Sequence, residues 1–188
     1  MFIQTEDTPN PLTLKFIPGQ TVLEKGTLEF KSNEESKNHK LANELFGTGN
    51  VTNVFVGKDF ISITKTETVE WEHIKPSFLS IIMNFFSAGG DFENETKSKP
   101  SEEKVVYSEG ELKIVNKVKQ LIEERVKPAV AQDGGDISFV SFKDGVVFLE
   151  LQGACSGCPS STATLKMGIE NMLRHYIPEV QEVRASGI

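Results

Sequence analysis

The spacing of apolar residues in the first half of the chain predicts short strands and two helices. Leu12–Phe16 alternates between apolar and polar residues, as a strand with one buried face does. Between Trp71 and Phe86 apolar residues recur at intervals of three and four, which is the spacing of an amphipathic helix. Gly57-Lys58-Asp59 separates two apolar runs and predicts a hairpin. The predicted elements of this half are strands over 12–16, 26–30, 51–56 and 60–66 and helices over 36–46 and 71–86.

In the second half the same patterns predict a helix, a hairpin, a second helix and a short strand. The first helix has a stripe of apolar residues that includes Val115, Val118 and Ile122. Asp144-Gly145 joins two apolar runs, and this dipeptide is typical of a tight hairpin turn. The predicted elements are helices over 111–126 and 159–176 and strands over 137–142, 146–151 and 180–184.

A polar, charged stretch from Gly89 to Ser108 interrupts these patterns and predicts a flexible linker. It divides the chain into a unit over 1–88, a linker over 89–108 and a unit over 109–188. Each unit mixes helices and strands. We therefore predict an α+β protein made of two small α+β domains joined by a flexible linker.

Charge and composition exclude several classes of partner. The 188 residues carry a net charge of −7, which argues against nucleic acid because phosphate binding requires a basic face. No stretch approaches the roughly 20 apolar residues that span a bilayer. The first residues show no basic region followed by an apolar core, so we expect no secretory signal. We expect a cytoplasmic protein of a bacterium, with the mitochondrial matrix as the alternative if a presequence has been removed.

The two cysteines of the chain, Cys155 and Cys158, are the strongest candidates for chemistry. They lie in Gly153-Ala154-Cys155-Ser156-Gly157-Cys158-Pro159, between a predicted strand and a predicted helix. The positive end of the helix dipole favours the ionised thiolate. Small residues surround both cysteines, so we expect two thiolates that point outward with little shielding.

Three interpretations of this pair remain open: a metal-free pair with no special role, a thiol–disulfide pair and a metal site. The pair is typical of thiol–disulfide oxidoreductases, although the pair in the thioredoxin-like class follows the first strand of a βαβ unit and this one follows a hairpin. Structural zinc and a [4Fe–4S] cluster each require four ligands, of which one chain supplies two thiolates. The three histidines, His39, His73 and His175, are scattered. Two chains related by a two-fold axis would supply the missing thiolates, so a metal site predicts a homodimer.

The second unit resembles the NifU-like (Nfu) iron–sulfur scaffold domain. The resemblance rests on 128–130, on Asp133-Gly134-Gly135-Asp136, on the hairpin and on 151–161 with its cysteines. The first unit resembles the Nfu amino-terminal domain through 5–11 and the Val54–Phe60 hairpin. This resemblance implies a carrier, not an enzyme, that binds a [4Fe–4S] cluster between two subunits through Cys155 and Cys158 of each. It implies apo iron–sulfur proteins as clients and upstream cluster assembly factors as donors.

Other residues have structural explanations that we favour over functional ones. Asp133-Gly134-Gly135-Asp136 could be a metal or phosphate loop, but a helix stop followed by a turn explains it better. We expect Trp71 and Phe85-Phe86 to be core residues. Lys166 and Arg174 could face a client or a cluster, and we expect them to be solvated helix charges.

Overall fold

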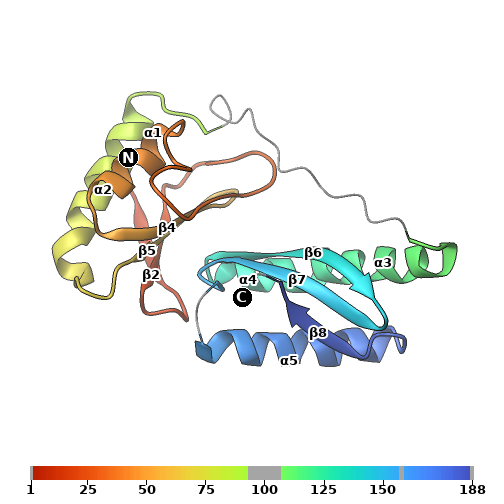
Figure 1. Ribbon diagram of the computed structural model, residues 1–188. Helices are drawn as coiled ribbons and strands as arrows, with labels where there is room; N and C mark the ends of the chain where they lie inside the picture. The colour runs from red at the N-terminus through yellow and green to blue at the C-terminus, as the bar shows by residue number, and fades with distance from the viewer. Residues whose placement is uncertain (1, 93–106, 157–158, 187–188) are drawn as a thin grey trace. The chain divides into compact units, whose positions relative to one another are not determined.

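The structure is a computed structural model that describes residues 2–92, 107–156 and 159–186, with the backbone alone for 159–162. The chain divides into two compact units, Met1–Lys99 and Pro100–Ile188. Each unit has its own sheet, helices and hydrophobic core (Figure 1). The predicted α+β class is therefore confirmed.

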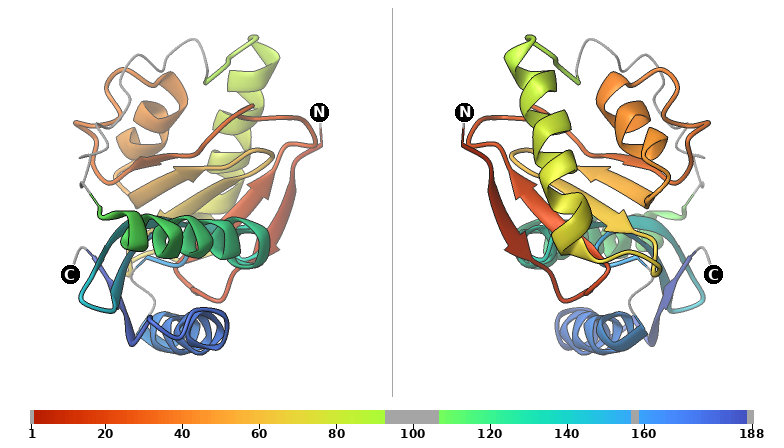
Figure 2. Two further views of the ribbon diagram at one scale, coloured as in Figure 1. Left: turned by 90° about the vertical axis from the view of Figure 1, so that its right-hand side faces the viewer. Right: turned by 90° about the vertical axis from the view of Figure 1, so that its left-hand side faces the viewer.

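The first unit is a five-stranded antiparallel sheet with two helices. Its strand order is β1-β2-β5-β4-β3, and Figure 2 shows both helices on the same side of the sheet. Alternate residues of the three central strands, such as Phe16, Val54 and Ile63, pack in one core cluster with α1 and α2. The elements are β1 (Gln4–Asp7), β2 (Thr13–Ile17), β3 (Leu28–Phe30), α1 (Lys40–Gly47), β4 (Val51–Val56), β5 (Ile61–Lys65) and α2 (Trp71–Ser87).

Most of the elements predicted for this unit are confirmed, with two differences. The strand β1 was not predicted, because Gln4–Asp7 is polar and pairs with β2 only at the edge of the sheet. The helix predicted from Ser36 begins at Lys40 instead. Ser36 forms local turn hydrogen bonds, including 2.8 Å from its hydroxyl to the carbonyl of Asn33, and such bonds compete with a helix start.

Of the aromatic residues of α2, Phe78 and Phe85 are buried in the core, whereas Trp71 and Phe86 are partly buried and pack against it. Trp71 packs near Phe16 and Phe78, and its indole N–H donates to the carbonyl of Pro11 at 3.1 Å. Phe85 is buried, and Phe92 is fully buried with its ring 5.3 Å from that of Phe85. The first unit therefore packs at least as far as Phe92, which the sequence assigned to the linker. Residues 93–106 of the predicted linker lie outside the described residues.

The second unit is a three-stranded sheet with helices on one face. The order is β6-β7-β8, with β6 and β7 antiparallel and β7 and β8 parallel. Its core cluster takes Val118 from α3, Ile137 and Val147 from the sheet, and Leu173 from α5. The elements are α3 (Glu109–Leu121), η2 (Ile122–Val126), α4 (Lys127–Gln132), β6 (Gly135–Lys143), β7 (Val146–Gly153), α5 (Pro159–Tyr176) and β8 (Glu182–Ala185).

The first helix of this unit is longer than the sequence predicted. It was expected to end about Val126, but α3, η2 and α4 follow one another without a break to Gln132 (Figure 1). The turn η2 is a π-helix and lies directly before Lys127-Pro128. A proline lacks an N–H and clashes with the preceding turn, and the wider π turn accommodates it. This extension carries the chain to Asp133, beside the cysteine loop.

Candidate functional site

The cysteine loop lies between the end of β7 and the start of α5, as the sequence predicted. Strand β7 ends at Gly153, which has φ +64°. The N–H of Ala154 then donates to the carbonyl of Gly134 at 3.1 Å, and the N–H of Ser156 donates to the carbonyl of Gly153 at 3.0 Å. Helix α5 begins at Pro159. The described part of the loop is therefore a tight turn attached by its backbone to the segment that precedes β6.

Cys155 is buried, which corrects the expectation of an outward, weakly shielded thiolate. It is 7% exposed and belongs to the core cluster of the second unit, and Ala154 beside it is 3% exposed. The small residues of the loop let its backbone approach neighbouring segments closely, so they do not leave Cys155 exposed. Cys158 lies outside the described residues, so its expected role as a ligand, and that of Cys155, stays a prediction.

Gly135 forms one wall of the space around Cys155. A Cβ atom at position 135 would lie 2.7 Å from the Cys155 Sγ and 2.6 Å from the carbonyl oxygen of Gln152, closer than real contacts allow. Gly135 pairs with Gly153 in the β6–β7 ladder, so both strands lack a side chain beside the cysteine. Position 135 must therefore be glycine for Cys155 to occupy this place.

The segment Asp133–Asp136 is the helix stop and turn that the sequence favoured. The N–H of Gly134 donates to the carbonyl of Ala131 at 3.1 Å, and Gly134 has φ +80°. Among the described residues, no group of three or more His, Cys, Asp or Glu is placed to hold a metal ion. What the sequence did not reveal is that this turn supports the cysteine loop, because that depends on the pairing of β6 with β7.

Lys127 links the long helix to the same turn. Its ammonium lies 2.7 Å from Glu123 Oε1 and 4.0 Å from Asp136 Oδ2. The Asp136 side chain is 13% exposed, so this contact is better shielded from solvent than a surface ion pair. The helix, the turn and the cysteine loop thus form one connected structure around Cys155.

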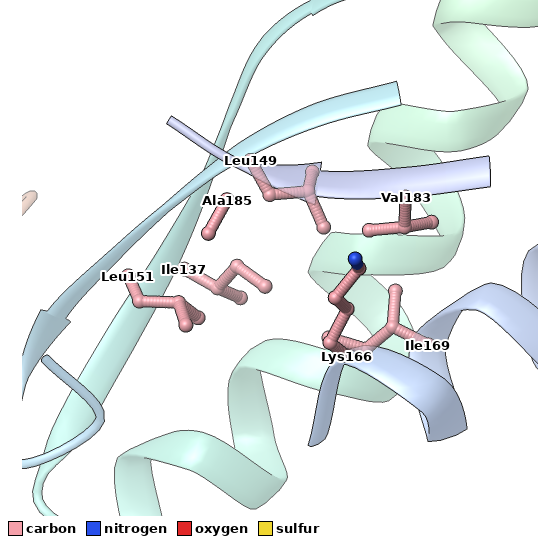
Figure 3. A pocket seen from close by; sticks show the side chains of 7 residues that line it. All are labelled: Ile137, Leu149, Leu151, Lys166, Ile169, Val183 and Ala185. Atoms are coloured by element: carbon pink, nitrogen blue, oxygen red, sulfur yellow. The ribbon is translucent and has the colours of Figure 1, made fainter. Parts of the chain in front are cut away.

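The two cationic residues of α5 that the sequence singled out have partners within the unit. Arg174 lies 3.7 Å from Glu170. Lys166 extends from α5 among apolar side chains (Figure 3). The pKa of Glu182 is lowered mainly by hydrogen bonds from Arg184, and the charge of Lys166 contributes a smaller part. The hollow there is lined by Ile137, Leu149, Leu151, Lys166, Ile169, Val183 and Ala185. Its volume of about 10 Å³ leaves space for no more than one water molecule, so it is not a ligand site.

Family models match both halves of the chain. Residues 3–89 match "Scaffold protein Nfu/NifU N terminal", and residues 118–184 match the "NifU-like domain". These matches fall on the two units that the structure separates. Within the described residues, none of the helices has both the length and the apolar character needed to cross a membrane.

Nearly the full length of this chain also matches relatives that are themselves longer. It is 47% identical over 184 residues to the human "NFU1 iron-sulfur cluster scaffold homolog, mitochondrial", covering 97% of this chain and 71% of that protein. It is 42% identical over 185 residues to "NifU-like protein 5, mitochondrial" of Arabidopsis thaliana, covering 97% and 67%. It spans 64% of the NFU1 homologue of Drosophila persimilis, at 47% identity over 184 residues. The solution NMR structure of a NifU-like protein from Saccharomyces cerevisiae matches 48% of this chain and 82% of its own, with 28% identity and a TM-score of 0.45.

Proposed function

Because the chain belongs to the Nfu/NifU family, we propose that it is an iron–sulfur cluster scaffold that carries a [4Fe–4S] cluster between two copies of itself. Cys155 and Cys158 of each copy are the ligands. The observation that supports this most directly is the match of 118–184 to the NifU-like domain, which contains both cysteines of the chain. The names of the relatives, which include iron–sulfur cluster scaffold, support the same role.

The number of ligands is the reason for two copies. A [4Fe–4S] cluster is typically held by four thiolates, and this chain has two cysteines. The described residues offer no group of other ligating side chains to complete the set. A two-fold arrangement supplies four equivalent thiolates at one point.

The surroundings of Cys155 support a preorganised ligand. Its position is fixed by the missing side chain at Gly135 and by the hydrogen bond from Ala154 to Gly134. A thiol whose place is fixed before the cluster arrives loses little conformational freedom on binding. A buried thiol is also a poor attacking group in thiol–disulfide exchange, which needs access. Delivery of a shared cluster also needs access to the Cys155 Sγ, so its burial by itself does not separate a ligand from the first thiol of an oxidoreductase.

Delivery of the cluster is an exchange of ligands. Each iron–sulfur bond to a cysteine of the carrier breaks as a bond to a cysteine of the acceptor forms. The acceptor thiols lose protons and the released carrier thiolates gain them, so no net electron transfer is required. The clients are apo iron–sulfur proteins, the donors are upstream assembly factors, and the chain is a carrier with no substrate turnover of its own.

We place this function in mitochondria. The human, Arabidopsis and Drosophila relatives are named as mitochondrial proteins, which favours the matrix over the bacterial cytoplasm. The first unit has no cysteine, so it cannot add a thiolate to the site. We assign it to the docking of partners, with the linker giving it reach.

Anaerobic reconstitution with ferrous iron and sulfide tests the proposal. The expected product is brown and contains about four irons and four sulfides per dimer, by analogy with four-thiolate cluster sites. A zinc site or a disulfide would give a colourless protein. A monomer that holds a full cluster without added thiol would contradict the shared site.

A further inference from the structure

The C-terminal end of α5 carries an exposed tyrosine that basic side chains surround. Tyr176 is the last residue of α5 and is 37% exposed. The guanidinium of Arg125 lies over its ring, 5.0 Å from the ring centroid, and the ring of His175 lies edge-on to it at 5.0 Å. The ammonium of Lys117 donates to the backbone carbonyl of Tyr176 at 2.8 Å. We call Lys117, Arg125, His175 and Tyr176 the Tyr176 cluster.

Part of this cluster has a purely structural explanation. The C-terminal end of a helix carries a partial negative charge and carbonyl groups without helical partners, and a nearby cation stabilises both. Lys117 satisfies one of these carbonyls with one of the donors of its ammonium. The same explanation does not cover Arg125, whose contact with α5 is made through the ring of Tyr176.

The N–H donors of Arg125 have no carboxylate partner in the described part of the second unit. The two acidic residues before it in η2 have other partners: Glu123 lies 2.7 Å from the Lys127 ammonium, and Glu124 accepts from Gln120 Nε2 at 2.9 Å. Within 107–156 and 163–186, none of the ion pairs includes Arg125. A guanidinium held over an aromatic ring keeps N–H donors around its edge, and that edge matches a carboxylate through two parallel hydrogen bonds.

The local structure positions these donors before a partner arrives. Arg125 lies in the π-helical turn η2, and single π turns inside helices occur frequently at functional sites. The ring of Tyr176 restrains the guanidinium, and the hydrogen bond from Lys117 restrains the end of α5 that carries this ring. Side chains that are already positioned lose less conformational entropy on binding. Arginine and tyrosine are also enriched among the residues that contribute most to binding at protein interfaces.

We propose that the Tyr176 cluster is a docking site for an acidic segment of a partner protein. One carboxylate of the segment binds the edge of the Arg125 guanidinium, and a second binds the remaining donors of the Lys117 ammonium. The hydroxyl of Tyr176 and the imidazole of His175 add polar contacts at the same place.

The distribution of charge favours this occupant. The chain has a net charge of −7, so most of its surface repels an acidic segment. Its three arginines are Arg125, Arg174 and Arg184. The other two have carboxylate partners, Arg174 in Glu170 and Arg184 in Glu182. Among the described residues, Arg125 is therefore the arginine whose charge a carboxylate does not already neutralise.

This site is separate from the cysteine loop. Helix α5 runs from Pro159 to Tyr176, so the loop and the Tyr176 cluster lie at opposite ends of a helix about 27 Å long (Figure 1). The inference goes beyond the proposed function, because an acidic partner should bind whether or not a cluster is present.

Fluorescence anisotropy with the full chain tests the docking site. The probe is a labelled peptide of alternating glutamate and serine, and the matched peptide has glutamine in place of glutamate. The glutamate peptide should bind at low salt and lose affinity as salt rises, whereas the glutamine peptide should not bind. No binding of the glutamate peptide at low salt would overturn the proposal. Equal or tighter binding of a single-stranded oligodeoxynucleotide of the same charge would overturn the assignment to an acidic protein segment.

Two arginine variants locate the binding. Arg184→Gln removes the same charge from the same unit as Arg125→Gln, but from an arginine whose guanidinium already bonds to Glu182. Arg125→Gln should raise the dissociation constant of the glutamate peptide about tenfold or more, and Arg184→Gln less than about twofold. Arg125→Lys keeps the charge and loses the planar edge, so it should retain only part of the affinity. Equal weakening by the two glutamine variants would reveal a general effect of net charge and would overturn the site.

Two further measurements separate this inference from the proposed function. Circular dichroism and the iron and sulfide content after reconstitution should be the same in Arg125→Gln as in wild type. An unfolded Arg125→Gln, or one that binds the glutamate peptide normally, would overturn the docking site and leave the cluster function standing. A wild-type protein that binds the peptide and holds no cluster would overturn the cluster function alone.

Discussion

At the scale of single residues, Gly135 determines whether Cys155 fits beneath the turn. We expect Gly135→Ala to displace the Cys155 Sγ, because the new Cβ would lie 2.7 Å from it. The cost in stability should be about 1–3 kcal/mol, as for other overpacked sites. The urea concentration at the midpoint of unfolding would fall, and so would the iron and sulfide content after reconstitution. Gly110→Ala is the control, since a Cβ there meets nothing within 4 Å. Normal cluster content in Gly135→Ala would show that the thiol position is not constrained.

Substitution of either cysteine should have the same effect on cluster binding, and substitution of the buried Cys155 should also lower stability. Cys155→Ser and Cys158→Ser should each abolish the stable cluster, because no other thiolate can replace the lost one. Cys155→Ser replaces a sulfur in the core by a smaller and more polar hydroxyl, so it should lower the free energy of unfolding by about 0.5–3 kcal/mol. Thermal unfolding measures that cost, and circular dichroism should show that both variants still fold. A cluster of normal absorbance in either variant would require a ligand outside the pair.

The sequence identified the cysteine pair but not the surroundings of Cys155. The spacing of two thiols in a strand–loop–helix context is visible in the order of residues. The contact between Gly135 and Cys155 joins positions 20 residues apart and depends on the register of β6 against β7. The spacing of apolar residues does not give that register. The loop was therefore expected to expose the thiol of Cys155, which the structure buries.

At the scale of elements, the start of α3 predicts a dependence of stability on pH. Ser108 and Glu111 form a capping box, with the Ser108 N–H donating to Glu111 Oε2 at 2.9 Å. The hydrogen bonds from Ser108 lower the pKa of Glu111 below its usual value of 4.5. Since the folded pKa is the lower one, this contribution is complete above about pH 4.5 and is lost as the pH falls through the folded pKa.

The measurement compares wild type with Glu111→Gln. Denaturant midpoints should differ most near neutral pH and converge in acid, because the wild type then loses its charged cap. The difference should be small, since the hydrogen bond between Ser108 and Glu111 is exposed to solvent. A difference that is constant from about pH 3 to pH 7 would mean that the ionised carboxylate adds nothing to the cap.

The sequence did not predict some elements, because their causes do not alter the spacing of apolar residues. Strand β1 lacks apolar alternation because it lies at a sheet edge. The π turn before Pro128 lets the helix continue past a residue that usually ends one. Strand β6 shifts register between Phe139 and Ser141, which lets both Phe139 and Phe142 pack against the core. Long amphipathic stretches such as α2 and α5 were predicted to within one residue of their ends.

At the scale of the whole molecule, the two units have separate cores and separate chemistry. Phe92 is buried in the first core, and Tyr107 packs against the second, where its hydroxyl accepts a hydrogen bond from the N–H of Phe142 at 3.2 Å. Among the described residues, each core cluster takes its members from one unit. Both cysteines belong to the second unit. Independent folding of the two units is therefore expected, with cluster binding confined to one of them.

A shortened protein of residues 105–188 tests this division of roles. It keeps Tyr107 and the Ser108 cap, so it should fold, dimerise on reconstitution and bind the cluster as the full chain does. If the first unit holds clients near the cluster, it raises their effective concentration through the linker. Transfer to a physiological client should then be slower from the shortened protein, while transfer to a non-specific apo-acceptor is unchanged. Equal slowing with both acceptors would point to an altered site. Failure of the shortened protein to hold a cluster would show that the first unit shapes the site itself, and the proposed division of roles would be wrong.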